Sequence, residues 1–216
     1  WNRPAAPFGH RRMSGVRSFD FTTMEGADCY RLMASSIMPR PIAWVTSISA
    51  EGVRNAAPYS FFNMMGSEPP VVALGILPGD VHQKDTARNL RDGGEFVVNL
   101  VSEAMAAQMN ETCAALPPEV DELTLAGVDT APSTQVAPPR ITGAPVAYEC
   151  RVAEVVNTGP HQLLIVGRVL AAHFHADALT PGDRPRVIPD ALDLIGRMYG
   201  ADAYVRTHDV FHMPRP

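Results

Sequence analysis

The stretch PRPIAWVTSISAEGVRNAAPYSFFN, residues 39–63, contains two runs that are typical of β-strands. These runs are 42–49 and 55–62, and the short polar break between them, which contains Gly52, predicts a hairpin. The two ends of the stretch therefore lie close together. At one end, prolines on both sides of Arg40 restrict the backbone, so we expect its guanidinium to be presented from a stiff support.

The other end of this stretch, 60–63, places two aromatic rings between a hydroxyl and an amide. Adjacent strand residues point to opposite faces, so Phe61 and Phe62 are not both expected to face the same ligand. The combination of Ser60, the aromatic rings and Asn63 favours binding of a flat heterocycle with polar edges.

Further strands and short helices are predicted along the chain: strands at 71–77, 95–101, 147–156 and 163–173, and helices at 28–36, 86–91 and 102–112. Asp85 or Thr86 is suited to cap the helix at 86–91. Strands that are interrupted by short helices, without regular βαβ alternation, predict a mainly-β fold. We expect an antiparallel, Greek-key-like barrel with helices at its ends.

The domain organisation is predicted to be simple. Residues 1–20 are rich in arginine, proline and glycine and form a basic arm that either wraps a partner subunit or is a loose tail. Residues 21–216 form a single domain, from which the proline-rich segment 116–139 leads away from the barrel. Within that segment, the pair Asp121-Glu122 is interpreted as solvated residues of a polar loop.

Composition excludes several classes of protein. With 216 residues, of which 46% are hydrophobic, the chain can bury one full core. A net charge of −5 argues against nucleic-acid binding, which requires a basic surface. No apolar run approaches the roughly 18 residues that a membrane span requires, and no signal-peptide pattern is present. The three cysteines are an odd number at spacings that fit neither a zinc site nor a CxxC pair, which predicts a reducing, cytoplasmic location. The scattered histidines predict no metal site.

Lys84 is the only lysine of the chain, and it directly precedes the cap of the helix at 86–91. A helix N-terminus favours anions, so Lys84 is a candidate contact for a phosphate group, with Thr86, Asn89 or a backbone N–H as other possible donors. The opposing interpretation is an ordinary solvated lysine before a capped helix. Neither the dinucleotide-binding pattern GxGxxG nor a phosphate-binding P-loop is present.

Four motifs in the same order, PRPIAWVTS, NAAPYSFFN, EPPVVALGI and KDTARNLRDGGEFVVNLV, resemble the flavin reductase-like family of FMN-binding split β-barrels. The resemblance covers about residues 25–205. It implies a noncovalent FMN on a homodimeric barrel. The residues that it implies for cofactor binding are Arg40, Pro41, Ile42, Ala43, Thr46, Ser60, Phe61, Phe62, Asn63, Lys84, Asp85 and Thr86.

The resemblance also implies the chemistry. It suggests an oxidoreductase, either an NAD(P)H-dependent flavin reductase or a related electron-transfer flavoprotein, in which the flavin carries the redox chemistry. Many short reductases similar to this family carry Gly-Asp-His near the nicotinamide. This chain has Gly159-Pro160-His161, so His161 is the candidate catalytic residue. The alternatives are a noncatalytic flavin-binding protein and a split barrel resembling pyridoxamine-phosphate oxidase or a haem-handling protein.

Overall fold

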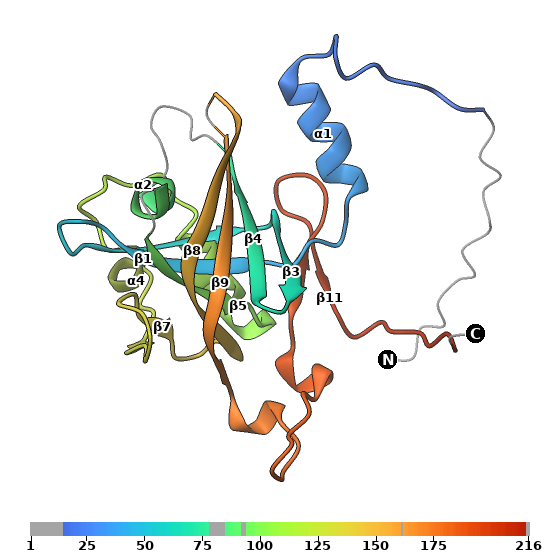
Figure 1. Cartoon of the computed structure of the whole chain (residues 1–216). Coiled ribbons are helices and arrows are strands. Elements are labelled where there is room, and N and C mark those ends of the chain that lie inside the picture. Colours follow the sequence, from blue (N-terminus) through green and yellow to red (C-terminus); the bar gives the residue numbers. More distant parts are fainter. Residues whose placement is uncertain (1–14, 78–84, 92–93, 161, 215–216) are drawn as a thin grey trace.

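Seven β-strands form one antiparallel sheet, in the order β2-β1-β5-β8-β9-β4-β3 (Figure 1). The computed structural model describes residues 15–77, 85–91, 94–160 and 162–214. The bounds of the seven strands are β1 (Ala43–Ile48), β2 (Arg54–Tyr59), β3 (Phe62–Ser67), β4 (Pro70–Ile76), β5 (Glu95–Leu100), β8 (Val146–Gly159) and β9 (Gln162–Phe174). Within the described residues, no helix is long and apolar enough to cross a membrane.

Short elements surround this sheet. They are α1 (Gly26–Ser36), α2 (Asp85–Arg91), η1 (Glu103–Met105), α3 (Ala106–Glu111), α4 (Glu122–Leu125), β6 (Thr130–Ala131), β7 (Arg140–Ile141), η2 (Ala176–Ala178), η3 (Pro189–Leu192), β10 (Ile195–Arg197) and β11 (Tyr204–Arg206). The prediction of a mainly-β, antiparallel barrel with short helices is confirmed. The long β8–β9 hairpin runs across the barrel and rises above it (Figure 1).

The two edges of the sheet are joined by a sharp corner of the chain. β2 lies at one edge and β3 at the other, and only Ser60 and Phe61 separate them in sequence. At the corner, the N–H of Gly75 on β4 donates to the carbonyl of Phe61 at 2.6 Å. A Cβ at position 75 would lie 3.0 Å from the Cβ of Phe61, so glycine permits this close approach. The single strand predicted at 55–62 is therefore wrong, because the chain crosses from one edge to the other at 60–61.

Two apolar clusters pack on opposite faces of β1. Ala43 and Val45 face the barrel interior, where they pack with Tyr59 of β2 and with Ala87 and Leu90 of α2. Trp44 faces the other way, into a second cluster, and its indole N–H donates to Thr112 Oγ1 at 2.9 Å. This alternation is the pattern expected of a strand buried on both faces.

The segment 116–139 covers the outer face of the barrel instead of leading away from it. Leu123, Ala126 and Val128 pack in the cluster that contains Trp44, and α4 contacts β2. Asp121 caps α4 by accepting from the N–H of Thr124 at 3.1 Å. Glu122 is 5% exposed. The interpretation of Asp121-Glu122 as a solvated pair is wrong, because the apolar residues that follow the pair fold it against the barrel.

A buried carboxylate fixes the next part of this segment. Glu149 of β8 is fully buried and accepts from the backbone N–H groups of Thr134 at 2.8 Å and Gln135 at 2.6 Å. The Nε2 of His173 lies 2.5 Å from Oε1 of Glu149, the same oxygen that accepts from Thr134. Burial acts to raise the pKa of Glu149, but the hydrogen bonds from Thr134, Gln135 and His173 outweigh it, so the pKa lies below its ordinary value.

Candidate functional site

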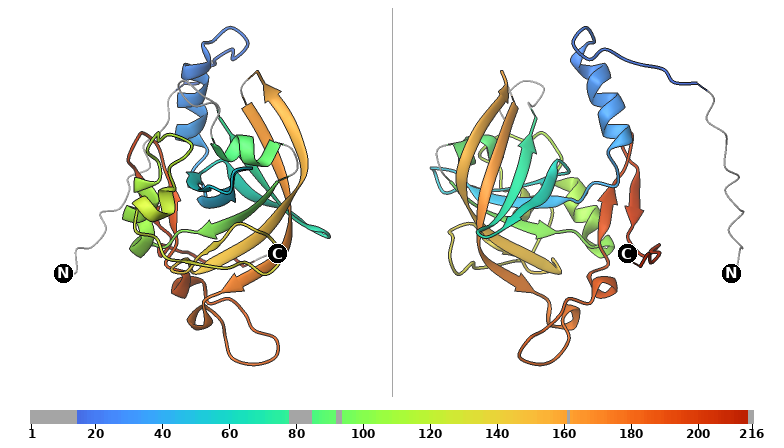
Figure 2. Two further views of the ribbon diagram at one scale, coloured as in Figure 1. Left: turned by 90° about the vertical axis from the view of Figure 1, so that its left-hand side faces the viewer. Right: turned by 45° about the vertical axis from the view of Figure 1, so that its right-hand side comes forward.

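Helix α1 stands beside the barrel, above the β10–β11 hairpin (Figures 1 and 2). Ala34 is its one buried residue, so the helix has little apolar contact with the rest of the chain. Arg40, which follows the helix and precedes β1, makes hydrogen bonds that hold its C-terminal turn. This arrangement places the C-terminal turn of α1 next to the corner between β2 and β3.

Arg40 is 8% exposed, and protein atoms accept hydrogen bonds from its guanidinium on three sides. Nη1 donates to the carbonyls of Ala34 at 2.5 Å and Ile37 at 2.8 Å, while Nη2 donates to the carbonyl of Met198 at 2.9 Å. Nε donates to Ser60 Oγ at 3.3 Å. Arg40 therefore caps α1 and ties it to the corner and to the β10–β11 hairpin. The expectation that its guanidinium is presented to a ligand needs correction, because these carbonyls occupy most of its donors.

Burial and the nearby guanidinium of Arg197 lower the pKa of Arg40. An arginine stays charged despite such a shift. The buried positive charge lies 5.8 Å from the ring centroid of Phe61, and the Phe61 ring in turn lies 6.2 Å from that of Tyr30 on α1. Phe61 thus faces the α1 side of the corner.

Phe62 faces the opposite side, as adjacent strand positions require, and lines an apolar pocket of about 560 Å³. Its lining comes from the segment just before β1, from β3 and β4, from the last residue of β5, from single residues of β8 and β9, and from the region of the β10–β11 hairpin. Five residues predicted to bind a cofactor line this pocket: Arg40, Pro41, Ile42, Phe62 and Asn63. A concave, mostly apolar pocket with a few polar groups is the usual form of a small-molecule site.

Three other predicted contacts lie inside the protein. Ala43 is fully buried in the barrel core. Thr46 is fully buried under the segment 116–139, where its hydroxyl donates to the carbonyl of Pro139 at 2.6 Å. Thr86 is 1% exposed. The side chains of these residues are packed or hydrogen-bonded within the protein, and their assignment as cofactor contacts stays a prediction.

The remaining predicted residues are placed as follows. Asp85 begins α2 and forms an ion pair with Arg88 one turn later. Ser60 is half-buried at the corner. Lys84 and His161 lie outside the described residues. Their assigned roles therefore stay predictions.

A polar cluster that the sequence did not single out lies where α2 meets the β1–β2 hairpin. The hydroxyl of Thr86 donates to Asn55 Oδ1 at 2.8 Å, and the hydroxyl of Ser47 donates to the same oxygen at 3.3 Å. Asn89 Nδ2 donates to Ser47 Oγ at 2.9 Å. The available signal was the presence of Ser47 and Asn55 at interior-facing strand positions, where apolar residues are usual.

Glu122 of α4 closes this cluster from the other side of the hairpin. Its carboxylate accepts from Asn55 Nδ2 at 3.0 Å and from the N–H of Ala56 at 3.1 Å. Burial raises the pKa of Glu122, and the hydrogen bonds from Ala56 and Asn55 offset only part of that shift. No local sequence signal identifies this residue, because its partners are more than sixty positions away.

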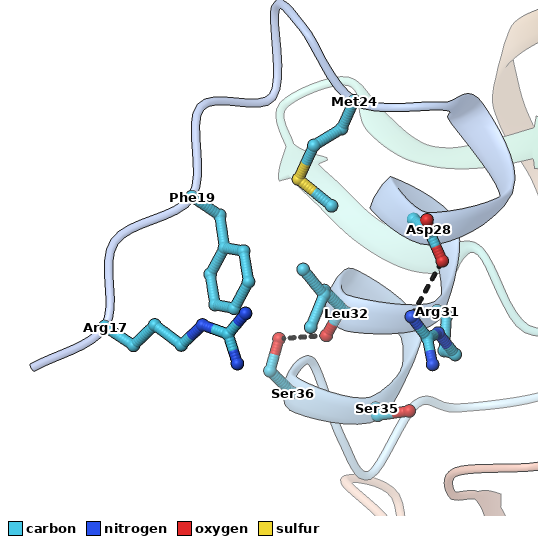
Figure 3. A pocket seen from close by; sticks show the side chains of 8 residues that line it. All are labelled: Arg17, Phe19, Met24, Asp28, Arg31, Leu32, Ser35 and Ser36. Carbon is cyan, nitrogen blue, oxygen red and sulfur yellow. Dashed lines mark hydrogen bonds and ion pairs between the residues drawn. The ribbon is translucent and has the colours of Figure 1, made fainter.

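A second hollow, of about 470 Å³, lies between residues 17–24 and one face of α1 (Figure 3). Figure 3 shows Phe19, Met24 and Leu32 around it. Arg17 lies over the ring of Phe19, and Arg31 is paired with Asp28. These polar groups have partners within the hollow, and exposed residues form most of its lining. Among the described residues, no group of three or more His, Cys, Asp or Glu side chains is placed to hold a metal ion.

Comparisons with known proteins agree with this architecture. A family model described as the flavin reductase like domain matches residues 33–197. An uncharacterized protein of Deinococcus radiodurans is 43% identical over 204 residues, which cover 91% of this chain and 88% of that protein.

Two solved structures are also similar. Nitrilotriacetate monooxygenase component B from Bacillus cereus gives a TM-score of 0.86 at 32% identity, with 93% of this chain and 100% of that chain covered. The 2-nitrobenzoate 2-nitroreductase NbaA of Pseudomonas fluorescens gives a TM-score of 0.83 at 33% identity, with 93% and 96% covered. The family model covers most of the sequence, and the resemblance seen in its motifs is confirmed: the chain belongs to the flavin reductase-like family.

Proposed function

We propose that the protein binds FMN noncovalently at the β2–β3 corner and acts as an NAD(P)H-dependent flavin reductase or a related electron-transfer flavoprotein. The observation that carries this proposal is the match to the flavin reductase like domain over residues 33–197, which include the corner and most of the pocket's lining. The similar solved structures, a monooxygenase component and a nitroreductase by name, support an oxidoreductase of this kind.

The corner has the chemical groups that a flavin ring requires. Apolar residues of the pocket, such as Phe62, suit the faces of the ring, and the Asn63 amide suits its polar edge, as does the half-buried Ser60 hydroxyl at the corner. Among the described strands, none pairs with the outer edge of β2, so backbone groups near the corner stay available. The N–H of Ala56 points away from β1, toward Glu122. Two residues later, the backbone nitrogen of Pro58 points the same way, and because proline has no N–H, no donor is left unpaired at this edge.

The phosphate is proposed to lie toward α2. The distance from the corner at Ser60 to Asn55, beside α2, is five strand residues, or about 17 Å, which matches the length of an extended FMN. Lys84 precedes α2 in sequence and is the proposed charged contact. We infer FMN instead of a dinucleotide because the sequence contains no dinucleotide-binding pattern.

A bound flavin would supply two-electron redox chemistry, while the protein binds it, orients it and excludes water. Among the described residues at the corner, none is placed as an obvious proton donor or acceptor, which suits this division of roles. His161 is the proposed contact on the nicotinamide side. Replacing His161 with alanine is expected to slow reduction of the flavin by NADH or NADPH while leaving FMN affinity nearly unchanged.

The test is titration of the purified protein with FMN, FAD and riboflavin, followed by anaerobic addition of NADH and of NADPH to the FMN-loaded protein. The expected results are tight binding of FMN, release of intact FMN on denaturation, and bleaching of flavin absorbance by one of the two nucleotides. Failure to bind any flavin would refute the proposal. Tight binding without reduction by either nucleotide would favour the noncatalytic flavin-binding protein.

We also propose that the functional unit is a homodimer, which covers the exposed apolar side chains around the corner. On α1, Tyr30 and Ile37 are 52% and 57% exposed, and on β3, Met64 and Met65 are 71% and 62% exposed. The contact between Tyr30 and Phe61 places α1 and the corner on the same side of the barrel. A second copy packed there, related by twofold symmetry, would cover these side chains and shield the flavin.

A matched pair of variants tests the dimer. Met65 on β3 and Leu125 on α4 are each 62% exposed. Analytical ultracentrifugation is expected to show a dimer for the parent and for Leu125→Glu, and a shift toward monomer for Met65→Glu. A parent that sediments as a monomer and still binds FMN tightly would contradict the proposal.

A further inference from the structure

The hydrogen bonds of the polar cluster all run in one direction. Asn89 donates to Ser47, Ser47 and Thr86 donate to Asn55, and Asn55 donates to Glu122. The chain of donors therefore begins on α2, crosses both strands of the β1–β2 hairpin and ends at a carboxylate on α4. Glu122, Asn55, Ser47 and Thr86 are each less than one-tenth exposed, so water has little access to most of these groups.

Glu122 determines this direction. An ionised carboxylate accepts hydrogen bonds and donates none. Because the N–H of Ala56 donates to one oxygen of Glu122, the other oxygen is left to Asn55, whose amide must present its NH₂ group there. The amide carbonyl of Asn55 then faces the opposite way, and only a donor can satisfy it.

Both hydroxyl protons are consequently turned toward Asn55. Thr86 and Asn89 belong to the same short helix, so their bonds to Asn55 and Ser47 fix α2 against the hairpin at two points one turn apart. If the Asn55 amide were reversed, its NH₂ group would face the two hydroxyls, and each hydroxyl would have to turn its proton elsewhere. Ala87 and Leu90 hold α2 against the core by apolar packing, and its polar contacts with the hairpin depend on a residue of α4 that does not contact it through any of these bonds.

We propose that Glu122 is a positioning residue of the flavin site: by fixing the orientation of the Asn55 amide, it fixes the position of α2, from which the phosphate of FMN is bound. This inference rests on the proposed function, since it assumes that the ligand is FMN and that its phosphate lies toward α2. Glu122 itself touches neither the flavin nor the reacting atoms.

Glu122→Gln tests the proposal. The substituted side chain keeps its size but has an NH₂ group in place of one carboxylate oxygen. This NH₂ group must face another donor, either the N–H of Ala56 or the NH₂ group of Asn55. FMN affinity is expected to fall about tenfold, the size of effect that follows loss of one hydrogen bond to a charged group. Riboflavin affinity should change little, because riboflavin has no phosphate. The ratio of FMN to riboflavin affinity, measured by fluorescence titration, therefore reports the position of α2 and not general stability.

A reciprocal variant makes the test sharper. In Asn55→Asp alone, two carboxylates face each other, and the FMN to riboflavin ratio is expected to fall. In the double variant Glu122→Gln/Asn55→Asp, the new amide donates to the new carboxylate and accepts from Ala56, while the carboxylate accepts from Thr86 and Ser47. Every group is satisfied again, so the double variant is expected to recover the parent ratio.

Glu149→Gln is the matched control. Glu149 is also a buried glutamate that accepts from backbone N–H groups, but its partners lie on the segment 134–135 and on β9. This variant is expected to lose stability and to keep the parent ratio. An equal fall in the ratio for Glu149→Gln would overturn the proposal, since any buried glutamate would then have the same effect.

The outcomes separate the two proposals. A parent protein that binds no flavin refutes both the proposed function and this inference. A parent that prefers FMN over riboflavin, together with an unchanged ratio in Glu122→Gln, refutes only this inference. If Glu122→Gln does not fold, the double variant decides: recovery of the parent ratio supports the proposal, and a low ratio overturns it.

Discussion

Gly167→Ala is predicted to destabilise the barrel by forcing a methyl group into a filled core. Gly167 lies on β9, and a Cβ there would lie 2.4 Å from Cζ and 2.9 Å from Cε1 of Phe96 on β5. Phe96 is fully buried, so its ring cannot move into solvent. The ring must therefore leave its position, or the two strands must separate locally.

The expected cost is that of overpacking a dense core, about 1–3 kcal/mol. For a domain of this size, each kcal/mol lowers the melting temperature by about 2–4 °C, so the predicted decrease is about 2–12 °C. Thermal and urea denaturation followed by circular dichroism would measure it, with the stability change read from the urea midpoint at constant slope.

Gly26→Ala is the matched control for this prediction. A Cβ at Gly26, the first residue of α1, would meet no atom within 4 Å. Alanine in a helix is favoured over glycine by about 0.5–1 kcal/mol, so this variant should be as stable as the parent or slightly more stable. Adding Phe96→Leu to Gly167→Ala should recover part of the loss, because the smaller side chain makes room. A Gly167→Ala protein with the parent's melting temperature would refute the reasoning.

Three further predictions follow from charged residues. The pKa of Glu149 is lowered in the folded state, so its stabilising contribution is complete above its unfolded-state pKa of about 4.3 and is lost as the pH falls through the folded-state pKa. The difference in stability between the parent and Glu149→Gln, measured by urea denaturation, should therefore be largest near neutral pH and should shrink in acid. Arg40→Met should leave the carbonyls that cap α1 without their donor and cost about 1–3 kcal/mol, with limited proteolysis at 26–37 becoming faster while the far-ultraviolet signal of the sheet is kept. Lys84→Ala should weaken FMN by roughly ten- to a hundredfold and leave riboflavin affinity unchanged; equal weakening of both ligands would assign Lys84 a structural role.

The strand and helix pattern was predictable because it depends on local chemistry. The prolines before β1, the glycine of the first hairpin and the polar residues Asp85 and Thr86 at the start of α2 each act within a few positions of themselves, so the sequence indicated where these elements lie. The break at Ser60-Phe61 was not predictable in this way. It contains no glycine or proline, and it exists because the chain must cross from β1's partner strand to the strand that pairs with β4.

The residues of the candidate site also differ in whether their roles depend on local or distant partners. Phe62 and Asn63 were identified because a motif places them side by side, and the structure puts them on the pocket. The roles of Arg40 and Glu122 depend on partners that are distant in sequence: Arg40 donates to a carbonyl 158 positions away, and Glu122 accepts from residues 66 and 67 positions away. Polar residues in a proline-rich segment are usually solvated. Glu122 is buried because the apolar side chains that follow it pack against the outer face of the barrel.

The corner between β2 and β3 has a consequence for local opening of the barrel. These strands form the two sides of the seam along which the sheet is split, and each is hydrogen-bonded to one neighbouring strand of the sheet. Since Ser60 and Phe61 connect them directly, release of the corner frees both strands at once. Amide hydrogens of 54–59 and 62–67 should thus exchange with solvent as one cooperative unit, ahead of β5 and β8 in the middle of the sheet. A ligand bound across the corner would slow amide exchange in both strands together, because binding would raise the free energy of this local opening.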